Sequence, residues 1–164
     1  MPKPARPKGH PKPAAKTVPI KLIVDNRKAR FQYDLLEKIE AGIALTGTEV
    51  KSLRQGKINV GDGYCRIDRD GQIYLVGVHI NPYTHAGYTR HEPLRERRLL
   101  LHKKEILRLH QRVKERGLTL VPVRLYLKQG RVKVEIALAK GKTLYDKRET
   151  VRKRDQAREA RANR

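Results

Sequence analysis

The sequence predicts a mainly β protein with short helices, folded as a small closed antiparallel barrel with about three helices and disordered basic termini. Three observations support this fold class. Residues 118–142 alternate in the pattern of a β-hairpin, residues 31–45 form an unusually long alternating run, and both ends of the chain are basic without an apolar pattern. Alternation is typical of strands with one buried face, and long, bent first strands belong to small barrels.

The hairpin is the clearest of these elements. Apolar residues alternate with polar ones on both sides of Gln129-Gly130, which predicts a two-residue loop. That register places Val123 opposite Ile136 on an apolar face and Arg124 opposite Glu135 on the other. The second face suits either a nucleic-acid surface or an ordinary solvated face. Its residues are Arg124, Tyr126, Lys128, Arg131 and Lys133.

The run at 31–45 is predicted to be one long strand that bends at Gly42. Its odd-numbered apolar residues, which begin with Phe31 and include Tyr33, would share one face, with Glu37 as the misfit. The strand would supply one wall of the barrel.

A short helix is predicted between Thr46 and Gly56. Thr46 and Glu49 fit a capping box, and Gly56 is a typical helix stop. Lys51 and Arg54 then lie together on the exposed side, three residues apart. Two cations on one turn cost a little stability, which favours an anionic partner.

A second hairpin is predicted around Asp70-Gly71, with Ile67 opposite Tyr74 and Cys65 opposite Val76. Cys65 is the single cysteine, which excludes an intrachain disulfide and a cysteine-based zinc cluster. Its place in an apolar alternation predicts a small core residue.

The stretch 81–94 is predicted to be a loop. His79, His85 and His91 recur there every six residues, which raises two hypotheses. One is a metal site, but no carboxylate or thiol cluster completes it, so no metal is expected. The other is a ribonuclease that uses His85, His91 and a lysine.

Beyond this loop, residues 95–101 have an ambiguous pattern, and His102 with Glu105 begins a helix that ends at Gly117. The order of elements suggests an OB-like barrel over residues 23–142.

The charge balance points to a polyanion. Lys and Arg number 39 against 17 Asp and Glu, so the 164-residue chain carries a net charge of +22. Nucleic acid is the leading partner. An anionic membrane surface is the rival, but no stretch has the apolar moment, length or lipidation signal that it needs. The amino-terminal segment lacks the apolar core of a signal peptide, which predicts a cytoplasmic protein.

The two termini are predicted to lie outside the barrel. Residues 1–22 form a Pro- and Lys-rich arm that should be disordered. Residues 143–164 are polar all round, with a helix-supporting Glu149–Lys153 pair. This tail should be disordered when free and helical on meeting RNA.

Four blocks carry a resemblance to a known family: NRKAR at 26–30, EAGIALTGTEVKSLRQGK at 40–57, RRLLLHKKEI at 97–106 and VKVEIALAKGKTLYDKRET at 132–150. Together they resemble the small protein B family of SsrA-binding proteins over about residues 24–164. The resemblance implies an OB-fold protein, with no catalysis and no cofactor, that binds transfer-messenger RNA and brings it to stalled ribosomes for trans-translation. The barrel would grip the tRNA-like domain at its D-loop elbow as a monomer, and the tail would enter the empty mRNA path near the decoding centre.

The resemblance also implies site residues by matching position. Glu40, Leu100 and His102 fall where the family needs residues for RNA binding. A basic motif at strand entry and the loop before the tail match as well. With Lys51, Arg54 and Lys133 from the residue patterns, the predicted RNA-binding set is Asn26, Arg27, Lys28, Arg30, Tyr33, Glu40, Lys51, Arg54, Leu100, His102, Lys133, Lys140, Gly141 and Lys142. The predicted ribosomal tail set is Tyr145, Asp146, Lys147, Arg148, Arg152, Lys153 and Arg154.

Two positions depart from the family pattern. Phe31 stands where relatives commonly have His, so stacking would replace any imidazole role. His102 stands where some relatives have Asn, and both can donate a hydrogen bond. Glu40 could contact RNA directly or form a structural salt bridge. A different OB-fold ribosome-binding factor stays an alternative, although it would not need the GKTLYDKRET tail.

Overall fold

The computed structural model describes residues 18–162. Within them lie nine strands and four helices. In chain order these are β1 (Ile20–Asp25), α1 (Arg27–Gln32), β2 (Tyr33–Ile43), α2 (Gly47–Arg54), β3 (Ile58–Asn59), β4 (Tyr64–Ile67), β5 (Ile73–Val76), β6 (His79–Ile80), β7 (Arg97–Leu100), α3 (Lys103–Arg116), β8 (Thr119–Lys128), β9 (Arg131–Gly141) and α4 (Leu144–Ala162).

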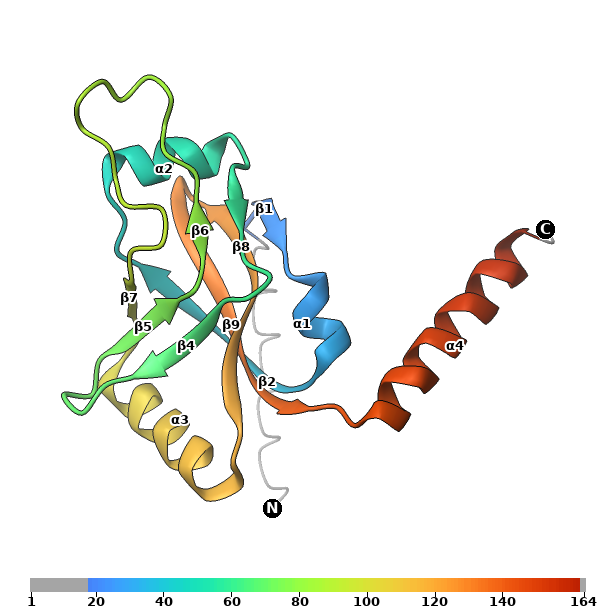
Figure 1. Cartoon of the computed structure of the whole chain (residues 1–164). Helices are drawn as coiled ribbons and strands as arrows, with labels where there is room; N and C mark the ends of the chain where they lie inside the picture. The colour runs from blue at the N-terminus through green and yellow to red at the C-terminus, as the bar shows by residue number, and fades with distance from the viewer. Residues whose placement is uncertain (1–17, 163–164) are drawn as a thin grey trace, which may run out of the picture.

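Six of these strands form a closed ring. Around the ring the order is β8, β4, β5, β7, β2 and β9, and β9 then pairs with β8. The pairings are antiparallel, and β1 adds to β8 from outside the ring. The predicted class, a mainly β antiparallel barrel, is therefore confirmed, although the structure has four helices and the tail forms one of them, α4. Figure 1 shows α3 at one end of the barrel, α2 near the other, and α4 projecting away from it.

The core fills the inside of this ring. Every ring strand contributes a buried apolar side chain, and Leu53 of α2 and Leu109 of α3 join the same cluster. Cys65 belongs to it, as predicted, and burial raises the pKa of its thiol. The predicted helix from His102 to Gly117 is also confirmed, because the backbone N–H of His102 donates to Glu105 Oε2 and Gly117 takes a positive φ of 58°.

The main hairpin confirms the predicted turn. Gln129 and Gly130 have φ angles of 52° and 74°, and this left-handed pair matches the twist of the two strands. The tip of the hairpin keeps the predicted register, since Arg124 pairs with Glu135.

Farther along the hairpin the register shifts by one. A bulge lies between Pro122 and Arg124, so Ile136 pairs with Pro122 and the predicted pairing with Val123 is wrong. The bulge has a physical cause, because proline has no N–H to donate and lies at bulges when it occurs inside a sheet.

The long first strand is shorter than predicted and is bulged. Phe31 lies in α1 rather than in β2. A register shift between Leu35 and Glu37 also divides the apolar residues between two faces. Tyr33 and Leu35 pack in a small outer cluster with Ala29 of α1, whereas Ile39, Ala41 and Ile43 pack in the main core. The expectation of a single shared face was therefore wrong.

The second hairpin has a three-residue loop. The backbone N–H of Asp68 donates to the carbonyl oxygen of Gln72 at 2.8 Å, and Gly71 has a φ of 71°. Cys65 consequently pairs with Leu75, not with Val76 as predicted. The three-residue loop, with its left-handed glycine, accounts for this shift of the strand register by one residue.

The boundary of the amino-terminal arm also needs correction. Ile20, Lys21 and Leu22 were assigned to the arm, but they lie in β1 and pair with β8. The remainder of the arm, up to residue 17, lies outside the described residues.

A buried ion pair fastens α2 to β7. Arg97 and Glu49 are both fully buried, and Arg97 Nε donates to Glu49 Oε1 at 2.9 Å. Burial alone would raise the pKa of Glu49, but hydrogen bonds from Arg95 and from the backbone of Thr46, together with the Arg97 charge, lower it to about 2. The predicted capping box is present as well, since the Thr46 N–H donates to Glu49 Oε2 at 2.9 Å.

Replacing Glu49 by glutamine should lower the free energy of unfolding by about 3 kcal/mol, because Arg97 would keep a buried charge without its partner. Glu49 ionises below its ordinary 4.5, so its contribution is present above that pH and is lost as pH falls toward 2. Urea unfolding at pH 7 and pH 3 measures both effects. Glu115→Gln, on the exposed side of α3, is the control, and equal stability of the two variants at pH 7 would contradict the account.

Candidate nucleic-acid interface

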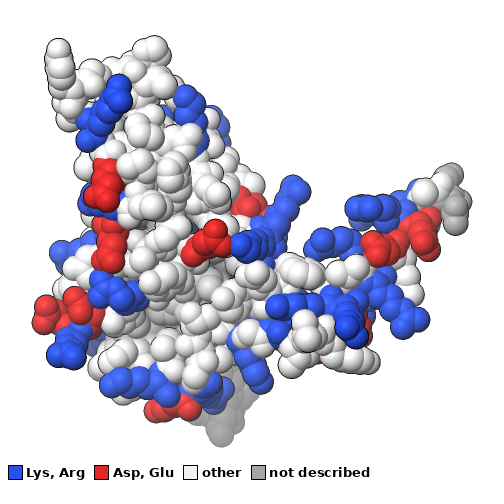
Figure 2. All heavy atoms as spheres, viewed as in Figure 1, with Lys and Arg blue, Asp and Glu red and all other residues white. Residues whose placement is uncertain are grey.

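Cations dominate much of the surface. Figure 2 shows Lys and Arg gathered along α4 and across the α3 end of the barrel, with Asp and Glu in smaller groups. Such a field attracts polyanions but does not specify one. Specificity requires shaped sites, and the described part of the chain contains one where four predicted residues meet.

This site is a hollow of about 400 Å³ where β2, β7, α3 and β9 come together. Gly42 of β2 brings the strands into place, because it pairs with Leu100 on one side and Lys133 on the other. Four predicted RNA-binding residues line the hollow, together with neighbours that were not predicted. The lining residues are Glu40, Gly42, Gln72, Arg98, Leu99, Leu100, Leu101, His102, Glu105 and Lys133.

Leu100 forms an apolar ridge at the edge of this hollow. Its side chain is 52% exposed, and it also lines a second hollow of about 330 Å³ with Val50 and Arg131. A Cβ atom on Gly42 would lie 3.1 Å from the Leu100 Cβ. Glycine at position 42 therefore allows the ridge to lie directly against β2.

Glu40 is held in place by two residues of β8. The Tyr126 hydroxyl donates to Oε2, and Lys128 Nζ donates to both carboxylate oxygens at 3.2 Å. The Tyr126 hydrogen bond is the largest cause of the lowered pKa of Glu40, and Lys128 adds to it. The salt-bridge interpretation of Glu40 is thus confirmed. Its side chain stays 38% exposed, so the ionised carboxylate can also accept from an amine or a 2′-hydroxyl.

Several members of the predicted RNA-binding set gather elsewhere, at the opposite end of the β2–β9 ladder. There Asp34 pairs with Lys140 and Tyr33 pairs with Gly141. Arg27 and Lys28 of α1 are exposed beside this end. The structure therefore does not bring the predicted set together at one place.

Asn26 does not lie on the surface. It is 2% exposed and caps α1, because its Oδ1 accepts from the Ala29 N–H at 3.0 Å. Its Nδ2 donates to the carbonyl oxygens of Val60 and Pro122. The predicted RNA contact at Asn26 is corrected to a structural one, since its polar groups are already bonded and Asn is a preferred cap.

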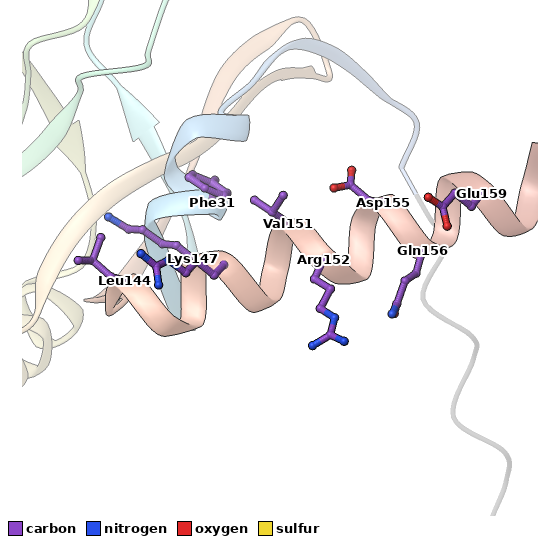
Figure 3. A pocket seen from close by; sticks show the side chains of 9 residues that line it. Phe31, Leu144, Lys147, Val151, Arg152, Asp155, Gln156 and Glu159 are labelled. Atoms are coloured by element: carbon purple, nitrogen blue, oxygen red, sulfur yellow. The ribbon is translucent and has the colours of Figure 1, made fainter.

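Lys142 connects α1 to α4. Its Nζ donates to the Arg30 carbonyl oxygen at 3.3 Å and to Thr150 Oγ1 at 3.4 Å. Figure 3 shows Phe31 pointing from α1 toward Val151 of α4. Phe31 lines a hollow of about 530 Å³ against α4, so its ring faces the tail helix.

The tail begins in a defined way. Thr143 Oγ1 and the Thr143 N–H both donate to Asp146 Oδ2, at 2.7 and 3.1 Å, and these bonds lower the pKa of Asp146. The predicted Glu149–Lys153 pair is present at 3.1 Å. No residue of α4 is buried. The remaining predicted tail residues, Tyr145, Lys147, Arg148, Arg152, Lys153 and Arg154, accordingly lie exposed or half-exposed.

The histidine loop has another function in the fold. His91 is 8% exposed, and its ring nitrogens lie 2.9 Å from Thr48 Oγ1 and 3.1 Å from the Ile80 carbonyl oxygen. Within residues 18–162, no group of three or more His, Cys, Asp or Glu side chains could hold a metal ion. Among the same residues, no helix is long and apolar enough to cross a membrane.

Comparison with known proteins identifies the family of this chain. The family model described as SmpB protein matches residues 23–164. The chain belongs to the SmpB family. The SsrA-binding protein of Syntrophobacter fumaroxidans is 55% identical over 152 residues, which cover 93% of this chain and 92% of that protein. That of Trichodesmium erythraeum is 59% identical over 139 residues, covering 84% and 88%.

A solved structure extends the likeness of this SmpB-family chain to three dimensions. Its description is "tmRNA-SmpB: a journey to the center of the bacterial ribosome". One chain in it is 47% identical, with a TM-score of 0.63, and the match covers 79% of this chain and 94% of that one. The resemblance stated from the four sequence blocks is therefore confirmed.

Sequence reasoning missed the residues that hold Glu40. Tyr126 and Lys128 were assigned to the basic face of the hairpin. Their contact with Glu40 was not predicted, because they lie 86 and 88 residues after it in the sequence. The alternating pattern showed which face of the hairpin they share, but it did not indicate that this face contacts Glu40 of β2. Gln72 and Arg98 were missed because the loop of the second hairpin and the ambiguous stretch at 95–101 concealed their positions.

Replacing Tyr126 by phenylalanine should raise the pKa of Glu40, because the hydroxyl that favours the ionised carboxylate would be gone. Carbon-detected NMR of the glutamate side chains over pH 2 to 7 measures this titration. Tyr74→Phe, on β5, is the control and should leave the Glu40 midpoint unchanged. An unchanged midpoint in Tyr126→Phe would show that the hydroxyl does not hold the carboxylate.

Proposed function

We propose that this protein binds the tRNA-like domain of transfer-messenger RNA through its barrel and delivers the RNA to stalled ribosomes for trans-translation. The observation that carries the proposal is the meeting of four predicted RNA-binding residues in the hollow beside Leu100. Membership in the SmpB family supports it, as do relatives described as SsrA-binding proteins.

The hollow offers the chemistry that a folded RNA needs. Leu100 presents apolar surface to the face of a base or a ribose, and Glu40 presents an oriented acceptor. Lys133 and His102 add donors for phosphate or base edges. An A-form helix keeps its major-groove base edges in a deep, narrow groove that side chains cannot read, whereas loops display unpaired bases. This favours the elbow of the tRNA-like domain, where the D-loop lies, as the bound region.

The tail is proposed to work on the ribosome, in the empty mRNA path near the decoding centre. Two features support this assignment. α4 has no buried residue. The stability of such a helix is marginal on its own, and contacts with surrounding RNA would increase it. The Thr143–Asp146 contacts fix where the helix would begin. Folding of the tail on the ribosome stays a prediction.

The proposed activity is binding without catalysis or cofactor. The ribonuclease hypothesis took His85 and His91 as its example, and the ring nitrogens of His91 already contact Thr48 and the Ile80 carbonyl oxygen. A different OB-fold factor would lack the matching tail. Because the proposed partners are transfer-messenger RNA and the ribosome, we place the protein in the cytoplasm, and one copy suffices since a single chain builds the hollow.

A change in the barrel and a change in the tail should affect different assays. Leu100→Ala should weaken binding to transfer-messenger RNA about fivefold to tenfold, through loss of the apolar ridge. Leu107→Ala is the control, because Leu107 is 60% exposed on α3 and does not line the hollow. Filter binding at physiological salt measures both variants, and equal affinities would remove Leu100 from the interface.

Truncation after Lys142 should have the converse result. The truncated chain keeps the barrel, so affinity for transfer-messenger RNA should stay within about threefold, which corresponds to less than 1 kcal/mol. Tagging on stalled ribosomes in a reconstituted translation system should be abolished. If truncation instead removed most of the RNA affinity, the proposed division between barrel and tail would be wrong.

A further inference from the structure

Residues 81–91 form a loop that is fixed at both ends and projects beside α2 (Figure 1). At one end, Ser52 Oγ donates to the carbonyl oxygen of Asn81 at 2.7 Å. At the other, the His91 ring contacts Thr48 Oγ1 at 2.9 Å. Both anchors lie on α2, so the loop between them is held at a defined place although it contains neither helix nor strand.

The projecting part of the loop presents aromatic rings. The Tyr83 and His85 rings meet edge to face, with centroids 5.6 Å apart. Tyr88 is fully exposed, at 108% of its reference area. A turn in which the Ala86 N–H donates to the Tyr83 carbonyl oxygen at 3.2 Å carries the chain from one ring to the next. The described chain therefore leaves a tyrosine face uncovered at the tip of an anchored loop.

One cation lies beside these rings, and two more are exposed on the same two segments. Lys51 Nζ lies 5.4 Å from the centroid of the Tyr83 ring, which is within cation–π range. Arg54 of α2 and Arg90 of the loop are exposed. Lys51 and Arg54 were predicted to bind RNA, yet neither lines the hollow beside Leu100. These two residues therefore belong to a different surface.

We propose that this loop and α2 form a second RNA-binding surface, which takes unpaired nucleotides by stacking their bases on Tyr88 and the Tyr83–His85 pair. Stacking on aromatic rings with cations beside them is how proteins bind single-stranded RNA without reading its sequence. Bases inside a duplex cannot reach such rings. Val50 of α2 and Leu100 line the second hollow together, so α2 lies close to the Leu100 ridge and one folded RNA can reach both surfaces.

The proposal is tested with full-length protein and fluorescein-labelled octa-adenylate, with an RNA hairpin of matched charge as the duplex probe. Tyr88→Ala should weaken octa-adenylate binding about tenfold, because each stacked base contributes about 1–3 kcal/mol. Affinity for the duplex probe should stay within about twofold, a change of less than 1 kcal/mol. Tyr88→Phe keeps the ring and should restore binding.

Two further variants separate stacking from charge. Lys51→Ala should lower the slope of log affinity against log salt by up to about one, whereas Tyr88→Ala should leave the slope unchanged. Tyr64→Ala is the matched control, since Tyr64 is 46% exposed on β4. Unchanged octa-adenylate binding in Tyr88→Ala, or an equal loss on the duplex, would overturn the proposal. The effect of Leu100→Ala on binding to transfer-messenger RNA tests the proposed function separately, so failure of the loop proposal would leave that function standing.

Discussion

The structure depends on the two-sided pairing of β9. This strand pairs with β2 along one edge and with β8 along the other, and the ring of the barrel closes only through it. Its inward residues, Val134, Ile136 and Leu138, are fully buried. Because β9 fixes β2 and β8 together, it also brings Tyr126 and Lys128 to Glu40 and places Lys133 beside Gly42. The proposed RNA site is thus a consequence of barrel closure.

Two levels of electrostatics operate in this molecule. The net charge of +22 attracts any polyanion and steers association. In the proposed function, selection among polyanions depends on a few side chains that the fold orients before binding. Glu40, for example, is held by the Tyr126 hydroxyl and by Lys128 Nζ. Binding to pre-oriented groups avoids the entropy cost of ordering them at the moment of contact. In the proposed function, the oriented carboxylate of Glu40 would therefore contribute to specificity.

Local signals in the sequence predicted much of this fold, and long-range contacts limited the rest. The Gln129-Gly130 turn and the Thr46–Glu49 cap follow from residues close in sequence. The bulges at Leu36 and Val123 each shift a register by one, and alternation alone cannot place an extra residue. The hollow joins residues from four elements, and only the family resemblance predicted Glu40, Leu100 and His102. The contact of Glu40 with Tyr126 spans 86 residues, beyond any local pattern.

The central claim is that the barrel carries a shaped RNA surface rather than charge alone. A competition assay at physiological salt tests it most directly, with transfer-messenger RNA set against bulk tRNA and duplex RNA. The account predicts a preference for transfer-messenger RNA of about three decades or more, within the range of specific sites. Equal affinity for all three RNAs would contradict it, because only the unselective attraction of a cationic protein would then remain.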